Sequence, residues 1–236
     1  MPTFEEIYAQ HAAEYDALVS REDHRGYLLP AIRQVIALDG IDVVELGAGT
    51  GRLTRLLAPH VRTIRAFDRS AHMLATARER LQANGGEWSL HVADNHAIPV
   101  ADACADLVIA GWSFGHATEW HGDRWRDEID TALREMTRIA RPGGALIILE
   151  TLGTGALHPA PPTPVLADYY AHLESIHGFA RAAIATDYRF ESLEEADRLV
   201  RFFFGDALAD QVQREGWIVL PEWTGLWSKR VHAHMA

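Results

Sequence analysis

The chain has 236 residues, of which 48% are hydrophobic and 23% are charged. This length suits one domain with a full hydrophobic core, and the composition excludes a disordered or collagen-like chain. A net charge of -11 provides no sequence-wide basic field for phosphate backbones or anionic lipids, so we expect neither nucleic acid nor membrane as a partner.

Cysteine usage and the N-terminal sequence indicate the compartment. Cys104 is the only cysteine, which excludes an internal disulfide and a multi-cysteine zinc site. The first residues lack the basic start and continuous apolar run of a secretory signal. No apolar stretch approaches the roughly 20 residues that cross a bilayer. We therefore expect a cytoplasmic protein.

Short apolar segments alternate with helical patterns in residues 39–150. The expected strands are residues 41–46, 63–67, 88–92, 106–110 and 145–150, and the expected helices are 52–58, 71–84 and 123–140. Alternating strands and helices imply right-handed crossovers. The pattern predicts an α/β fold with a doubly wound, mainly parallel sheet covered by helices on both faces.

Three further segments flank this core. Residues 1–38 have amphipathic patterns and are expected to form a helical N-terminal cap. Residues 151–210 are expected to form a helical insert or lid, with helical patterns at 165–178 and 192–215. Residues 211–236 resemble a hairpin that completes the sheet with antiparallel strands. The cap and the insert could cover the carboxyl edge of the sheet, where ligands bind in open α/β folds.

A glycine loop follows the first strand, in the sequence VVELGAGTGR. Gly47, Gly49 and Gly51 allow a sharp turn and a close approach of a ligand to the backbone, so the loop predicts a bound cofactor. A dinucleotide fingerprint would have its third glycine at the position of Arg52. The spacing therefore favours a nucleoside with an amino-acid tail over a dinucleotide.

Acidic residues stand at the ends of three successive strands. Asp68 can accept hydrogen bonds from both ribose hydroxyls, and Asp94 can accept one from an adenine amino group. Glu45 can balance a cationic amino group or sulfonium, directly or through water. Each residue alone is also compatible with an ordinary strand end or helix cap. Together, at one edge, they favour a nucleoside site.

Four motifs resemble those of the class I S-adenosylmethionine-dependent methyltransferases: VVELGAGTGR, AFDRSAHML, VADNHAIPVADACADLVIAGWSF and RIARPGGALIILE. The resemblance covers about residues 40–150 and, more weakly, the C-terminal segment. It implies a Rossmann-like fold, S-adenosylmethionine as cofactor and methyl transfer as the activity. This family varies in the segments that correspond to residues 1–38 and 151–210, so the resemblance does not identify the acceptor.

The resemblance also implies roles for single residues. Gly47, Ala48 and Gly49 would border the methionine moiety, Asp68 the ribose, Arg69 and Met73 the adenine face, Asp94 with Asn95 the adenine edge, and Gly111 with Trp112 the reacting methyl. We further expect Tyr15, Glu45 and Gly51 to contribute to the cofactor site, and Tyr8 and Trp120 are other candidate pocket aromatics.

Methyl transfer is an in-line displacement that positioning alone can accelerate strongly, so a general base is optional. If a hydroxyl or protonated amine is the acceptor, His116 is the first candidate base, because the fourth strand leads to the reacting end. His11, His121, Glu119 and Glu150 are the alternatives, and the chain has 13 histidines, most of them expected on the surface.

His91, Asp94 and His96 lie close enough in the sequence to form a metal site, but their spacing does not require one. We expect no metal ion. The interpretation is a methyltransferase that acts on a small molecule at O or N, as a monomer or homodimer. An NAD-dependent oxidoreductase is disfavoured by Arg52 and by Lys229 being the only lysine, and a non-catalytic cofactor-binding or scaffold protein is the other alternative.

Overall fold

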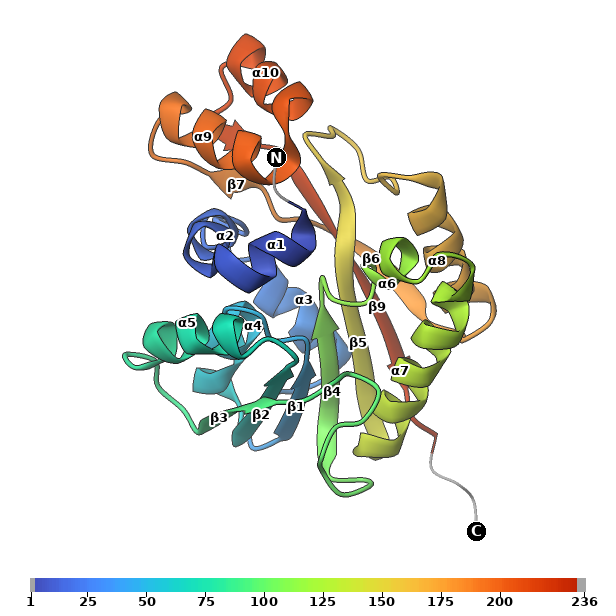
Figure 1. Ribbon diagram of the computed structural model, residues 1–236. Coiled ribbons are helices and arrows are strands. Elements are labelled where there is room, and N and C mark those ends of the chain that lie inside the picture. Colours follow the sequence, from blue (N-terminus) through green and yellow to red (C-terminus); the bar gives the residue numbers. More distant parts are fainter. Residues whose placement is uncertain (1–2, 233–236) are drawn as a thin grey trace.

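A seven-stranded sheet forms the centre of the computed structural model, which describes residues 3–232 (Figure 1). The strand order is β3-β2-β1-β4-β5-β9-β6. The parallel strands are β1 (Asp42–Leu46), β2 (Thr63–Asp68), β3 (Trp88–Val92), β4 (Ala105–Gly111) and β5 (Ala140–Thr154). β9 (Glu222–Arg230) runs antiparallel to both β5 and β6 (Ala180–Ala185). The predicted doubly wound, mainly parallel sheet with an antiparallel C-terminal strand is confirmed.

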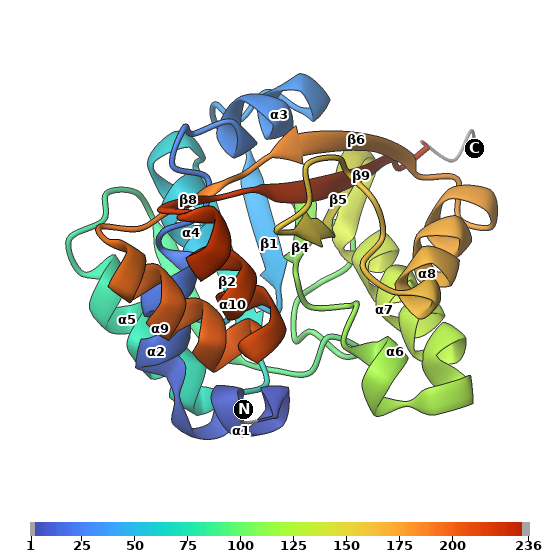
Figure 2. The same ribbon diagram turned by 90° about the horizontal axis from the view of Figure 1, so that it is seen from above.

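Helices cover both faces of this sheet (Figure 2). On one side lie α3 (Leu28–Val35), α4 (Arg52–Leu57) with the short η1 (Ala58–His60), and α5 (Ala71–Leu81). On the other lie α7 (Trp125–Ile139) and α8 (Pro164–Ser175), with α6 (Ala117–Trp120) and η2 (Gly122–Arg124) before them. Val43 packs with α3 and α4, and its neighbour Val44 packs with α7. Strand alternation explains this, because successive side chains point to opposite faces.

The N-terminal segment forms two short helices, α1 (Phe4–Gln10) and α2 (Ala12–Val19), ahead of α3. The Thr3 side chain accepts a hydrogen bond from the Glu6 amide, and the Glu6 carboxylate accepts one from the Thr3 amide, which fixes the start of α1. α1 and α2 contact α5, and α2 also contacts α9. In residues 3–232, every helix is too short or too polar to span a membrane.

A small lobe stands above α1 and α2 (Figure 1). It consists of β7 (Tyr188–Arg189), α9 (Leu193–Phe204), α10 (Asp206–Glu215) and β8 (Val219–Leu220). The continuous helix predicted over 192–215 is wrong, because Gly205, with φ of +88°, separates α9 from α10. Leu18 of α2 packs into this lobe.

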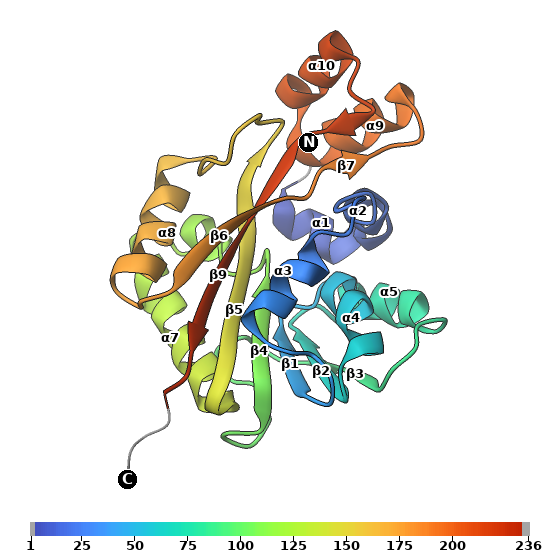
Figure 3. The same ribbon diagram turned by 180° about the vertical axis from the view of Figure 1, so that it is seen from behind.

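The predicted insert over 151–210 is only partly helical. Residues 180–185 form β6, which lies beside β9 at the edge of the sheet (Figure 3), and residues 188–189 form β7. The β6 sequence ARAAIA is rich in alanine and lacks an alternating pattern, so its strand conformation comes from pairing with β9.

The predicted C-terminal hairpin is also wrong. β8 pairs with β7 in a separate two-stranded sheet, whereas β9 pairs with β5 and β6. Only Pro221 separates β8 from β9. One residue is too few to reverse the chain between paired strands, so the two strands continue from one sheet into the other.

Candidate functional site

A cavity opens at the carboxyl ends of β1, β2 and β4, below α1 and α2. Its lining includes most of the predicted cofactor residues: Tyr15, Glu45, Gly47, Ala48, Gly49, Asp68, Arg69, Met73, Asp94, Asn95, Gly111 and Trp112. It also includes the candidate bases His116 and His121. Parallel strands bring these residues together from distant parts of the chain, because their carboxyl ends meet at one edge.

The three loop glycines serve different purposes. All have positive φ, of +72° at Gly47, +54° at Gly49 and +81° at Gly51. A Cβ at Gly47 would lie 2.1 Å from Ser113 Oγ, and one at Gly51 would lie 3.1 Å from the Ala77 Cβ. Gly47 and Gly51 are thus required by protein packing, and Gly51 is not among the lining residues.

Gly49 differs because its free side faces the cavity. A Cβ there would meet only the Met73 Cε at 3.6 Å and the Tyr15 Cε1 at 4.0 Å, and both of these side chains line the cavity. Any larger side chain would occupy the space between the loop and these residues. Gly49 is therefore the loop position where the missing side chain leaves room for a ligand.

Asp68 fixes the loop from the end of β2. Its Oδ2 accepts a hydrogen bond from the Gly49 amide at 2.8 Å, and its Oδ1 accepts one from the Ser70 amide at 2.8 Å. Burial raises the pKa of Asp68, and these two backbone hydrogen bonds oppose the increase. Each carboxylate oxygen retains a further acceptor site, so Asp68 can hold the loop and still accept from a ligand hydroxyl.

Glu45 is buried in β1, and no basic side chain of residues 3–232 forms an ion pair with it. Its side chain accepts a hydrogen bond from the Thr54 hydroxyl at 2.6 Å, and burial raises its pKa to about 8. The carboxyl group is therefore largely protonated at neutral pH. Since Glu45 lines the cavity, a ligand ammonium or sulfonium nearby would favour the ionised carboxylate.

The predicted adenine-edge residues lie at the mouth of the cavity. Asn95 donates from Nδ2 to the Ser113 hydroxyl at 3.0 Å. Asp94 is turned back on its own loop, where Oδ1 accepts from the His96 amide at 2.9 Å. Its side chain is 57% exposed, so its second oxygen remains accessible to a ligand.

Trp112 and Arg52 form one wall at the end of β4. Trp112 has φ of +49°, and the Arg52 guanidinium carbon lies 3.7 Å from its ring centroid. Arg52 Nη1 also donates to the buried Glu22 carboxylate at 2.6 Å. Arg52 thus fills the position of the third glycine in a dinucleotide fingerprint.

His116 belongs to an aromatic cluster contributed by α1 and the segment after β4. Its Nε2 lies 2.7 Å from the Tyr8 hydroxyl, and its ring stacks on Trp120 with centroids 4.8 Å apart. Burial, reinforced by Arg69, lowers the pKa of His116 to about 4, so its imidazole is neutral at pH 7. Trp120, in the same cluster, also contacts Arg69: the guanidinium carbon lies 4.5 Å from the Trp120 ring centroid.

Three candidate bases do not line the cavity. His11 packs against Phe202 in the upper lobe, with ring centroids 5.5 Å apart, and Glu119 is exposed. Glu150 is buried outside the cavity lining, where it accepts a hydrogen bond from the Gly115 amide at 2.9 Å, and burial raises its pKa to about 8. His11 does not reach the cavity because it lies at the end of α1 and faces the upper lobe. Glu119 does not reach it because α6 directs its side chain to solvent.

Sequence reasoning missed Ser113 and Ser70. Ser113 fills the space beside Gly47, and the Ser70 hydroxyl donates to the Tyr8 carbonyl at 3.1 Å, which ties α1 to the start of α5. Ser70 also caps α5 by accepting from the Met73 amide. The cap pattern was visible in the sequence, but the contact with Tyr8 joins residues 62 positions apart and left no local signal.

The residues present fit S-adenosylmethionine. Gly49 provides the space, Asp68 provides hydroxyl acceptors, and Glu45 provides a latent negative charge for a cationic tail. Two further polar atoms, Thr50 Oγ1 and Arg52 Nη2, are buried without a hydrogen-bond partner among residues 3–232, and both residues line the cavity. Buried polar atoms are normally satisfied, so these two atoms are candidate partners for a polar ligand in the cavity.

Comparison with known proteins also indicates a methyltransferase. Residues 44–148 match the family model described as a methyltransferase domain. The chain is 31% identical over 147 residues to a ubiquinone/menaquinone biosynthesis C-methyltransferase of Rubrivivax gelatinosus, covering 61% of this chain and 54% of that protein. It is 31% identical over 158 residues to a malonyl-[acyl-carrier protein] O-methyltransferase of Pectobacterium atrosepticum, covering 64% and 54%. The chain thus spans about half the length of these curated relatives.

Among solved structures, the fold is similar to that of phosphoethanolamine N-methyltransferase 2 of Haemonchus contortus in complex with S-adenosyl-L-methionine. The TM-score is 0.59 at 16% identity, and the alignment covers 99% of this chain and 61% of the other. At this identity the likeness concerns the fold alone.

Proposed function

The chain belongs to the class I S-adenosylmethionine-dependent methyltransferases, and from this premise we propose that it transfers the methyl group of S-adenosylmethionine to a small molecule at O or N. The observation that carries the proposal is the cavity at the carboxyl edge, where Gly49, Asp68 and Glu45 meet an aromatic wall. When bound, the cofactor supplies an electrophilic methyl group on a sulfonium.

In this proposal the glycine loop, Gly47 to Gly49, borders the methionine moiety, and Asp68 accepts from the ribose hydroxyls. Met73 and Arg69 contact the adenine face, and Asp94 with Asn95 accepts and donates at its edge. Trp112 closes the end near the sulfur. These roles agree with the side-chain positions described above, and each can be tested by substitution.

A small acceptor is supported by the cover over the cavity. Tyr8 and Tyr15 descend from α1 and α2, and Trp120 approaches from α6. Tyr8 contacts both other rings edge-on, at centroid distances of 5.6 Å to Tyr15 and 6.5 Å to Trp120. Such a wall suits a flat or apolar acceptor. The net charge of -11 further disfavours nucleic acid.

For an O or N acceptor, the Tyr8 and His116 pair provides a route for the proton. Methyl transfer to a hydroxyl or protonated amine would leave a proton for the protein to remove from the acceptor. Tyr8 can take that proton as its own passes to His116 Nε2, 2.7 Å away. Because the pKa of His116 is about 4, this imidazole is a weak base. The transfer becomes favourable only once methylation has made the acceptor acidic.

The test is a screen of hydroxyl and amine acceptors that measures S-adenosylhomocysteine formation by mass spectrometry. Wild-type protein should turn over at least one class, and His116→Gln should reduce kcat by roughly 10-fold to 100-fold, at or below the lower limit of the range for general acid–base groups because this imidazole is a weak base. His11→Gln, a histidine outside the cavity, is the matched control and should leave kcat unchanged.

The alternatives predict different results. A non-catalytic cofactor-binding protein would bind S-adenosylmethionine tightly and turn over no acceptor. An NAD-dependent oxidoreductase would show a thermal shift with nicotinamide cofactors and none with S-adenosylmethionine. Full activity of His116→Gln would reject the proton route while leaving methyl transfer by positioning alone.

A further inference from the structure

Three potential metal ligands converge on the face of the sheet covered by α7 and α8, which lie side by side in Figures 1 and 2. Asp130 comes from α7, His172 from the last turn of α8, and His177 from the turn that follows. His172 Nε2 and His177 Nε2 each lie 2.7 Å from Asp130 Oδ1. The two Nε2 atoms are 3.2 Å apart.

We propose that Asp130, His172 and His177 bind a divalent transition-metal ion, Zn²⁺ being the ion that the donors suit best, and that this ion clamps the end of α8 to α7. The site lies between α7 and the end of α8, apart from the glycine loop. It is independent of the proposed methyl transfer. None of its residues lines the cavity at the carboxyl edge.

The donor set selects the class of ion. Two imidazoles and one carboxylate are typical of zinc and other first-row metals, whereas Mg²⁺ and Ca²⁺ prefer oxygen ligands. Bonds of about 2.0 to 2.1 Å in a tetrahedron place adjacent ligand atoms about 3.3 Å apart. The separation of 3.2 Å between the two imidazole nitrogens already meets this value. The carboxylate needs to withdraw from each nitrogen by about 0.6 Å, which a side-chain rotation provides.

The histidines are held in place by their surroundings. The His172 side chain is 11% exposed, and its ring packs edge-on against Trp125 with centroids 5.6 Å apart. The His177 amide donates to the His172 carbonyl at 3.2 Å, and the Lys229 ammonium donates to the His177 carbonyl at 2.7 Å. Anchored ligands lose little freedom on binding a metal, which favours affinity.

Access and charge are also suitable. A cavity beside the cluster is lined by Asp130, Leu133, Arg134, Thr137 and His177, so a fourth ligand such as water can reach the ion. The nearest cation in that lining, Arg134, donates to the Thr131 hydroxyl at 2.8 Å.

Simple hydrogen bonding within the cluster is the competing explanation, and titration distinguishes the two. The full chain, stripped with a chelator, is titrated with ZnCl₂ by calorimetry and with CoCl₂ by visible absorption. We expect one equivalent to bind, with the absorption of a four-coordinate cobalt site. His172→Ala and His177→Ala should each weaken binding by at least about 100-fold, more than the loss of an outer-shell partner. His158→Ala, an exposed histidine elsewhere, should bind as the wild type does.

Asp130→Asn guards against misfolding of the histidine variants, because it preserves side-chain volume. Zn²⁺ should raise the Tm of wild-type protein and leave that of Asp130→Asn unchanged, and MgCl₂ should shift neither. Imidazole resonances of His172 and His177 should shift in the wild type on adding Zn²⁺. Absence of saturable binding to the wild type, or equal binding by the histidine variants, would overturn the proposal.

Discussion

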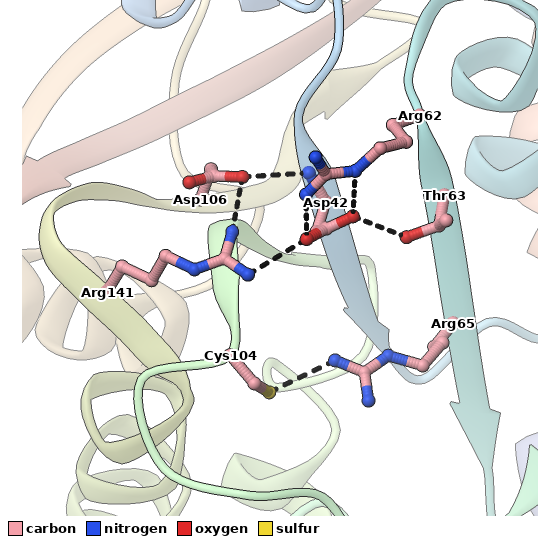
Figure 4. A network of polar contacts seen from close by, with 7 residues as sticks. All are labelled: Asp42, Arg62, Thr63, Arg65, Cys104, Asp106 and Arg141. Atoms are coloured by element: carbon pink, nitrogen blue, oxygen red, sulfur yellow. Dashed lines mark hydrogen bonds and ion pairs between the residues drawn. The ribbon is translucent and has the colours of Figure 1, made fainter.

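The two ends of strand β1 place a carboxyl group in opposite environments. At the amino end, Asp42 is surrounded by partners: Arg62 and Arg141 donate to its oxygens, and so does the Thr63 hydroxyl (Figure 4). Hydrogen bonds from Arg62 hold the pKa of Asp42 well below its usual range. Three residues later, Glu45 forms no ion pair with any basic side chain in the described part of the chain, and burial raises its pKa to about 8.

This difference between the two ends of β1 indicates that the amino end stabilises the fold and that the carboxyl end is suited to binding a ligand. The amino end extends its network through Asp106, which accepts from Arg141 at 2.6 Å, so its charges are satisfied by the protein itself. The carboxyl end leaves Glu45 protonated and the Thr50 hydroxyl unpartnered within the described chain. Charged groups that the protein pairs stabilise the fold, whereas an uncharged carboxyl and an unpartnered hydroxyl that line the cavity are available to a ligand.

Gly49→Val should have the largest effect. The valine would have to adopt φ near +54° and would project into the cavity toward Met73, so S-adenosylhomocysteine affinity should fall at least about 100-fold, or about 2.7 kcal/mol. Calorimetry measures this. Gly26→Val is the matched control, since Gly26 has φ of +69° with open space around it. It carries similar backbone strain and should retain affinity; an equal loss in both variants would contradict a ligand role for Gly49.

Asp68→Ala should weaken cofactor binding by about 1 to 3 kcal/mol, the range for losing a hydrogen-bonding partner in a buried site. The carboxylate would no longer accept from the ribose or from the Gly49 amide. Asp68→Asn, which keeps the shape and one acceptor oxygen, should show a smaller loss by the same calorimetric titration. Unchanged affinity of Asp68→Ala would remove the ribose assignment.

Asp42→Asn tests the other end of the strand. Because the folded pKa of Asp42 is depressed, its stabilisation is present at neutral pH and is lost as pH falls from about 4 toward the folded pKa. The variant should lose about 1 to 2 kcal/mol of unfolding free energy at pH 7 and less at pH 3, by urea denaturation. Cofactor affinity should not change. Asp123→Asn, an exposed carboxylate, should alter neither quantity; a binding defect in Asp42→Asn would break the contrast.

Glu45→Gln should have the smallest effect at a single pH and should be visible in the pH dependence. Below pH 8 a cationic ligand must expel the Glu45 proton, so wild-type affinity should rise with pH toward 8, by up to about tenfold per pH unit. The Glu45→Gln variant should not show this rise of affinity with pH. Glu150→Gln is the control, because that carboxyl also has a pKa of about 8 but does not line the cavity. Parallel pH profiles for wild type and Glu45→Gln would contradict the role of Glu45.

Local patterns predicted which edge of the sheet carries the cavity. The run from Asp42 to Arg52 contains the strand, the turn and the first helical residue in consecutive positions, so its conformation is specified by near neighbours. Asp68 could be placed at the same edge because parallel strands share their carboxyl ends. The pairing of Tyr8 with His116 was not predictable, since it spans 108 positions and depends on how α1 docks.

Errors occurred where distant segments decide the structure. The segment before β9 resembled a hairpin by composition, but β5 and β6 provide its partners. The histidine pair at 172 and 177 is close in sequence, and this spacing could have been noticed. Its carboxylate, Asp130, lies on another helix, so the sequence alone gave no reason to join the three.

Calorimetric titration of S-adenosylmethionine into the wild-type protein tests most directly whether the carboxyl edge is a cofactor site. We predict saturable binding of one molecule per chain, with proton release in buffers below pH 8 because Glu45 ionises. No heat and no thermal shift with S-adenosylmethionine or S-adenosylhomocysteine, from protein shown to be folded, would contradict the assignment.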